Sequence, residues 1–257
     1  MDTPLHSAWL LRAAAAALVL ASACGSDTPA GPSSGATEQL TVKFESAHFR
    51  IMGNRVSPST VTAVADALEQ QFGRITADLG VAQMPVVTVK LWVDTESFYQ
   101  EMAAKAGQRY AGATGFVGGL SEVSILDGAN AGGRAVHEFA HVVSMAVNPR
   151  IGNNPRWLWE AVAIFEAQEF VDPTRLSYLA AGQFPTLSAL SSDFSSSQQI
   201  YEVGYLLGEF VVATWNRAGL IRLIQANGDT ATALGITTSQ FEQRWADFVR
   251  QKYFTPR

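Results

Sequence analysis

Two histidines that stand four residues apart constrain this chain more than any other feature. His137 and His141 enclose Glu138 in an H-E-x-x-H pattern, inside an apolar segment whose periodicity predicts a helix over residues 134–147. Residues four apart share one face of a helix, with Cβ atoms about 5–6 Å apart, so both imidazoles can reach one metal ion. Glu138 projects to one side of that face. The pattern predicts part of a zinc site, with Glu138 placed to act as a general base.

The candidate third ligand is a glutamate on a later apolar segment. Glu160 follows His141 after eighteen intervening residues and lies in the sequence W-L-W-E-A-V-A, residues 157–163. An unpaired carboxylate is costly to bury in such surroundings, and a metal ion removes that cost. Glu160 is therefore a candidate to join the two histidines at one metal ion.

The spacing and the surrounding letters resemble those of the gluzincin zinc metallopeptidases, especially the aminopeptidase-N-like and peptidase-MA-like branch. That group has H-E-x-x-H, eighteen residues, and then Glu within W-L-x-E-G-x-A. Ala161 stands where the group usually has glycine. The resemblance implies that His137, His141 and Glu160 hold one Zn²⁺ ion, with a fourth position left open. It also implies a zinc-dependent hydrolase of peptide bonds, acting on a peptide or protein substrate, with Glu138 as the catalytic base.

A further segment carries the resemblance beyond the metal pattern. Residues 200–207 are similar to the Y-x-x-G helix of the aminopeptidase-N-like enzymes, which implies that the Tyr201 hydroxyl stabilises the oxyanion. Val203 replaces the lysine that often precedes that glycine. Tyr205 is four residues further on and shares the helical face, so it stays open as the alternative donor. Residues 241–253 resemble the C-terminal helix of peptidase-MA-like proteins.

The pattern that anchors a substrate amino terminus in aminopeptidases, G-x-M-E-N, is absent from the chain. This absence favours an endopeptidase. The resemblance also implies that a strand near residues 113–117 is a sheet edge that pairs with an extended substrate.

Two other kinds of function stay open at this point. One is a zinc-binding or inactive peptidase-like lipoprotein that works as a binding or assembly factor, although such a protein has no need of the base Glu138. The other is a zinc hydrolase of a non-peptide amide or ester. Nucleic acid is excluded as a partner because 18 Lys and Arg face 23 Asp and Glu, a net charge of -5 without a basic cluster.

The N-terminal segment has the character of an export signal. Arg12 is its only basic side chain, and the apolar run that follows it, residues 13–23, is too short to span a bilayer. Cys24, the only cysteine of the chain, follows L-A-S-A, which resembles the lipobox of bacterial lipoproteins. We expect cleavage after residue 23 and lipidation of Cys24.

These signals predict an exported protein of the cell envelope, attached to a membrane through the lipid on Cys24. Residues 25–37 are rich in Gly, Ser, Pro and Thr and predict a flexible tether. The alternative is an ordinary signal peptide and a secreted protein. Residues 38–257 then form the metallopeptidase domain.

The order of predicted elements is typical of an α+β fold. Strands or extended segments are predicted first, with two helices between them, and the chain from Gly133 onward is almost wholly helical, so a small mixed sheet should precede a helical half that carries the metal site. The extended segments are 41–51, 87–93, 113–117 and 123–127, with a turn at Gly118-Gly119; the helices are 58–79 capped by Ser57, 95–105 capped by Thr95, 134–147, 157–170, 198–216, 220–226 and 239–253.

Three other polar residues are weaker candidates. His48 lies on a predicted strand, where a satisfied structural role is expected rather than a fourth metal ligand. Glu166 and Glu169 are six and nine residues beyond Glu160. If the helix continues that far, their helical phase predicts that both face solvent.

Overall fold

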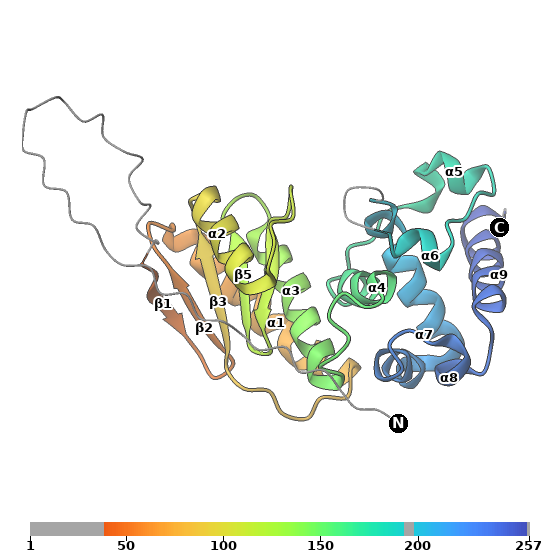
Figure 1. Cartoon of the computed structure of the whole chain (residues 1–257), viewed down its shortest axis with the longest axis horizontal. Helices are drawn as coiled ribbons and strands as arrows, with labels where there is room; N and C mark the ends of the chain where they lie inside the picture. Colours follow the sequence, from red (N-terminus) through yellow and green to blue (C-terminus); the bar gives the residue numbers. More distant parts are fainter. Residues whose placement is uncertain (1–38, 193–197, 256–257) are drawn as a thin grey trace, which may run out of the picture. The chain divides into compact units, whose positions relative to one another are not determined.

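The computed structural model describes residues 39–192 and 198–255 (Figure 1). The predicted signal peptide, the lipidated Cys24 and the tether lie outside the described residues. The fold is α+β, as predicted: a five-stranded mixed sheet comes first and a mainly helical half follows. Within the described ranges, no helix combines the length and the apolar character that a bilayer span requires.

The elements follow one another along the chain in the order that Figure 1 labels. The strands are β1 Thr41–Glu45, β2 Phe49–Gly53, β3 Val87–Trp92, β4 Gly115–Gly119 and β5 Glu122–Leu126. The helices are α1 Pro58–Asp78, α2 Thr95–Ala106, α3 Ala131–Val147, α4 Arg156–Glu166, α5 Ser177–Ala180, α6 Leu187–Leu190, α7 Gln199–Gln225, α8 Thr230–Leu234 and α9 Thr238–Val249, with a 3₁₀ turn at Pro173–Arg175 and a π-helical turn at Arg250–Phe254.

The sheet has the strand order β1-β2-β3-β5-β4. The central pairs β2/β3 and β3/β5 are parallel, and the outer pairs β1/β2 and β4/β5 are antiparallel. Strand β4 therefore lies at an edge, as predicted for the strand near residues 113–117. Only β5 pairs with it among the described residues, so its outer side is open to a further strand.

The two faces of the sheet are covered by different helices. Val87, Val89 and Leu91 alternate along β3 and point into the main hydrophobic core, which they share with α1 and α3. Trp92 points to the other face, where it packs with Phe98 and Met102 of α2. Helices α1 and α3 contact each other along this sheet (Figure 1).

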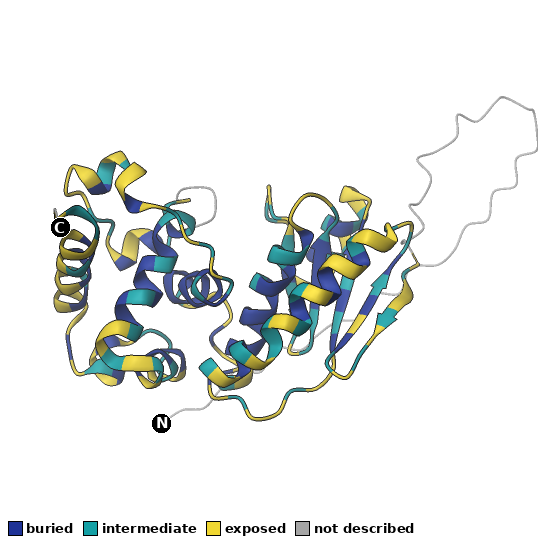
Figure 2. Ribbon diagram, turned by 180° about the vertical axis from the view of Figure 1, so that it is seen from behind, coloured by how far each residue is buried: buried dark blue, intermediate teal, exposed yellow. Residues whose placement is uncertain are grey.

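Helix α4 is the centre of the helical half and is buried along nearly its whole length (Figure 2). It packs against both α3 and α7. A Cβ atom on Gly204 of α7 would lie 2.6 Å from the Ile164 side chain and 3.4 Å from the Cα atom of Ala161. A larger residue at position 204 would force the Ile164 side chain to move, so glycine favours the close approach of α7 to α4.

Several predicted boundaries in the N-terminal half were wrong in detail. The extended segment 41–51 is a hairpin, because Ser46 turns the chain and its amide donates to the Phe49 carbonyl at 2.9 Å. The cap of α2 is Asp94 and not Thr95, since the Asp94 carboxylate accepts from the Ser97 amide at 2.6 Å. Gly118 and Gly119 belong to β4, and the turn to β5 follows them.

The helical half differs from prediction at two points. The predicted helices 198–216 and 220–226 form one element, α7, interrupted at Asn216 with φ 55° and ψ -173°. Helix α4 ends at Glu166 instead of residue 170. Gln168 adopts a left-handed backbone, with φ 59°, and the Glu169 amide donates back to the Ile164 carbonyl at 3.0 Å. The chain therefore leaves the helical direction before Glu169.

Glu166 was predicted to face solvent, and this was wrong: its side chain is 0% exposed. Its carboxylate accepts from Arg74 of α1 at 2.8 Å and from Arg217 of α7 at 2.5 Å. Arg217 also pairs with Asp78 at 2.7 Å. A carboxylate can be buried here because two cations from other helices compensate its charge, and the group joins α1, α4 and α7.

We expect Arg217→Ala to lower the free energy of unfolding by roughly 2–4 kcal/mol, because Glu166 then keeps only one cation. The value stays below that of a fully buried pair because Arg217 is 34% exposed. Urea denaturation measures it. The matched control is Arg50→Ala, which breaks the exposed Arg50–Glu45 pair at 2.6 Å and should cost about 1 kcal/mol or less. Equal losses in both variants would contradict a structural role for the buried cluster.

Candidate metal centre

The three predicted ligands meet where α3 and α4 cross. His137 and His141 lie one turn apart on α3, and Glu160 lies on α4. His141 and Glu160 are each 3% exposed, and the His137 side chain is 12% exposed. The two helices are apolar on the surfaces around these residues, so the polar groups gather in a small buried patch at the contact.

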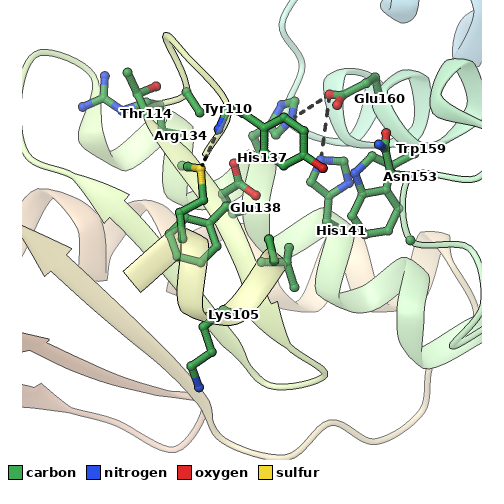
Figure 3. Close-up of a pocket in the computed structure, with 18 of the residues that line it drawn as sticks. Lys105, Tyr110, Thr114, Arg134, His137, Glu138, His141, Asn153, Trp159 and Glu160 are labelled. Carbon is green, nitrogen blue, oxygen red and sulfur yellow. Dashed lines mark hydrogen bonds and ion pairs between the residues drawn. The ribbon is translucent and has the colours of Figure 1, made fainter. Parts of the chain in front are cut away.

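The ligand atoms have a geometry that suits one ion. One atom of each residue lies within 4.8 Å of the other two. Both imidazoles turn Nε2 towards Glu160, whose Oε2 lies 3.4 Å from that atom of His137 and 3.9 Å from that of His141 (Figure 3). Ligands of a tetrahedral zinc ion at bond lengths near 2.1 Å are separated by about 3.4 Å. The side chains thus stand close to coordinating positions.

The hydrogen bonding of Glu160 supports a cation at this point. Its Oε2 atom is buried and accepts no hydrogen bond from the described residues. A buried carboxylate oxygen without a donor is costly, and a divalent cation between it and two imidazole nitrogens would remove the cost. Two nitrogens and one carboxylate oxygen are also the donor set of catalytic zinc sites that keep a position open.

The pKa values of the two histidines move in opposite directions. Burial lowers the pKa of His137, but Glu160 and Glu169 outweigh it and hold the pKa well above its usual value. Burial, with His137 as a neighbouring charge, holds the pKa of His141 well below its usual value. A metal ion that binds here would therefore displace a proton from His137.

Glu169 was predicted to face solvent, and this was wrong: the structure places it against His137, one of the three candidate ligands. One of its carboxylate oxygens lies 3.2 Å from Nδ1 of His137, and its side chain is 38% exposed. The prediction failed because it continued the helix to residue 170, whereas the left-handed Gln168 turns the chain. A carboxylate on the outer nitrogen fixes the ring of a ligand histidine and leaves Nε2 for the metal.

Glu138 lies beside the cluster and contributes no atom to it. Burial raises the pKa of its carboxyl to about 8; Glu160 and Glu169 add to the increase and His137 opposes it. The carboxylate is packed under the start of β4, where a Cβ atom on Gly115 would lie 2.5 Å from Oε1. Only glycine at position 115 lets the edge strand pass so close to this carboxylate.

The cluster opens into a cavity of about 810 Å³. Its walls are formed by the end of α2 and the loop that follows it, by β4, by one side of α3 and the loop after it, and by the first turns of α4 and α7. Glu138, His137, His141 and Glu160 all line it (Figure 3). A molecule bound in this cavity would contact both the edge strand β4 and the three candidate metal ligands.

The structure separates the two candidate tyrosines. Tyr201 lines the cavity, and its pKa is raised far above its usual value by burial and by Glu160, with Arg156 opposing. Tyr205 packs against Phe165 and Phe170, with ring centroids 5.3 and 5.2 Å away, and does not line this cavity. The phenol of Tyr201 is therefore the neutral donor of the pair that faces the cluster.

His48 lies outside the metal cluster, as predicted. Its Nδ1 atom is 2.7 Å from Glu69, and its ring stacks on Phe72 at 3.7 Å.

Sequence reasoning missed Gly115 and Trp159, which lie against Glu138 and His141 respectively. Neither carries a sequence signal, since a glycine in a strand and a tryptophan in an apolar helix are common in proteins without any site.

Comparison with known proteins adds no family to this picture: no protein-family model matches the chain, and no curated protein does.

We expect the domain to bind about one zinc ion per chain, because three suitable donors converge with a fourth position open. Elemental analysis of the purified protein should show zinc in the wild type and a sharp loss in His137→Ala and Glu160→Ala. His48→Ala is the matched control and should keep the metal, since His48 lies outside the cluster. Equal zinc in all four proteins would contradict the assignment of the ligands.

Proposed function

We propose that this chain is a zinc-dependent peptidase. One observation carries the proposal: Glu138 lies next to a three-ligand cluster without belonging to it, at a cavity bordered by an open sheet edge. A metal-binding protein without catalysis has no use for a buried carboxylate beside the ligands. The resemblance of the 137–160 segment to gluzincins supports the same reading.

The metal would be held by His137, His141 and Glu160. When bound, zinc would polarise a substrate carbonyl and make a nearby water more acidic. A cation beside Glu138 would also lower the pKa of its carboxyl from the value of about 8 that burial produces. Glu138 would then be ionised near neutral pH, ready to accept a proton from the attacking water and to return it to the departing amine.

Strand β4 is suited to hold an extended peptide. Its outer edge has no partner strand among the described residues, and Gly115, Phe116 and Val117 line the cavity. A peptide that adds to this edge would form backbone hydrogen bonds along β4. Because Glu138 lies directly under Gly115, the peptide bond next to that position would come close to the base.

Tyr201 would stabilise the negative charge that develops on the carbonyl oxygen of the substrate. Its raised pKa keeps the hydroxyl protonated at neutral pH, so the phenol can donate a hydrogen bond. Arg156 lies over the Tyr201 ring, 5.7 Å from its centroid, and adds positive charge beside the phenol. A phenol donor favours an oxyanion more than a neutral carbonyl.

An extended peptide paired along the open edge of β4 would continue on both sides of the cleaved bond, which favours endopeptidase action. We also propose that the enzyme works in the cell envelope of a bacterium and is tied to a membrane by the lipid on Cys24. That part of the proposal rests on the sequence of residues 1–37 alone.

We expect Glu138→Gln to keep zinc and fold while hydrolysis falls by about 10²–10⁴, because the amide cannot accept the proton. A fluorogenic peptide library measures the activity of both proteins, with chelator and with zinc restored. Chelator should stop cleavage in the wild type and zinc should restore it. Undiminished turnover by the zinc-loaded variant would remove Glu138 from the mechanism. Cleavage of esters or non-peptide amides, but of no peptide, would change the substrate class.

We expect Tyr201→Phe to lower kcat by about 10²–10³ with little change in KM, because the lost hydroxyl acts mainly in the transition state. Tyr205→Phe is the matched control: it removes a hydroxyl one turn along α7, away from the cavity, and should leave kcat near wild type. Both variants should carry zinc. The reverse pattern would transfer the role to Tyr205, and two unchanged values of kcat would exclude both phenols.

A further inference from the structure

We infer that Trp159 is a positioning residue for the metal: its indole fixes the ring plane of His141 so that Nε2 points at the ion. The inference rests on the metal site of the proposed function, but not on peptide hydrolysis. It starts from a difference between the two histidine ligands, which hold their rings in place by unlike contacts.

The outer nitrogen of each ligand histidine has different surroundings. Nδ1 of His137 lies 3.2 Å from Glu169. Nδ1 of His141 is buried and has no hydrogen-bond partner among the described residues. The outer nitrogen of a ligand histidine almost always donates to a carboxylate, a carbonyl or a water, and that bond orients the ring. His141 lacks such a bond and needs another means of orientation.

Trp159 provides a flat surface against the His141 ring. The two ring centroids are 3.9 Å apart and the planes differ by 8°, so the rings are stacked over each other (Figure 3). Trp159 is itself 8% exposed and is held within the hydrophobic core. The imidazole cannot rotate about its Cβ–Cγ bond without breaking this stack.

The position of Trp159 in α4 joins this contact to the third ligand. Trp159 immediately precedes Glu160, so one rigid helix presents the carboxylate ligand and the stacking surface together. Any displacement of α4 would move both relative to α3. Helix α4 would therefore contribute to the metal site in two ways. It provides the Glu160 oxygen, and it orients the His141 ring through Trp159.

The test compares the zinc affinity of four proteins by competition with a chelating dye. Trp159→Leu removes the aromatic face, and we expect its affinity to fall on the order of tenfold. Trp159→Phe restores a flat ring and should recover most of the affinity. Trp157→Leu is the matched control, because Trp157 is also buried on α4 but packs against Phe241, with ring centroids 5.7 Å apart.

A second readout reports the contact directly. The emission of the Trp159 indole is the difference in tryptophan fluorescence between the wild type and Trp159→Phe. Co²⁺ bound in place of Zn²⁺ should quench this emission. Unchanged zinc affinity in Trp159→Leu overturns the inference. So does an equal loss in Trp157→Leu, since that would mark a general effect on α4. A wild type that binds no zinc overturns the metal site and this inference together, whereas a zinc-binding wild type without peptidase activity overturns only the proposed function.

Discussion

The site depends on the contact between the buried carboxylate of Glu160 and the two histidines, His137 and His141, where α3 and α4 cross. Glu160 is 3% exposed, and its Oε2 atom faces the Nε2 atoms of both histidines at 3.4 and 3.9 Å. No residue in the described part of the chain donates a hydrogen bond to this oxygen. Such a group is tolerated in a protein core only where positive charge meets it. Protonation of His137, whose pKa stays well above its usual value despite burial because of Glu160 and Glu169, would supply one such charge, and a metal ion would supply a stronger one. The geometry of the two helices therefore suits a cation at this point.

The same constraint explains why the carboxylates near the cluster behave differently. Glu166, on the far end of α4, is compensated by Arg74 and Arg217 and serves the structure alone. Glu169 is partly exposed and holds the outer nitrogen of His137. Burial raises the pKa of Glu138 to about 8, although the neighbouring His137 opposes the increase. Glu138 differs from Glu166 in that it lines the cavity beside the three candidate ligands, and this position suits it to proton transfer.

The two halves of the fold each supply one wall of the cavity. The open edge of the sheet, β4, contacts Glu138. This contact is possible because residue 115 is a glycine and has no side chain. The helical half brings Tyr201, because Gly204 lets α7 lie directly on α4. Substrate edge, base and oxyanion donor thereby meet across the metal cluster, although they come from β4, α3 and α7. The chemistry that we propose needs both halves at once.

The class of fold, most of the elements and the three candidate ligands could be predicted from the amino-acid sequence. Local rules suffice for the elements and for two of the ligands: alternation along β3, the period of α1 and α3, and the spacing of His137 and His141 on one helical face. Glu160 was predicted from the resemblance of its segment to gluzincins. The residues that surround the ligands could be identified only in the folded structure. Glu169 reaches His137 because Gln168 turns left-handed, and Trp159 meets His141 because α4 crosses α3 at that point. Contacts of this kind depend on where a helix stops and how two helices cross, which are set by the packing of the whole core and leave no local pattern in the chain.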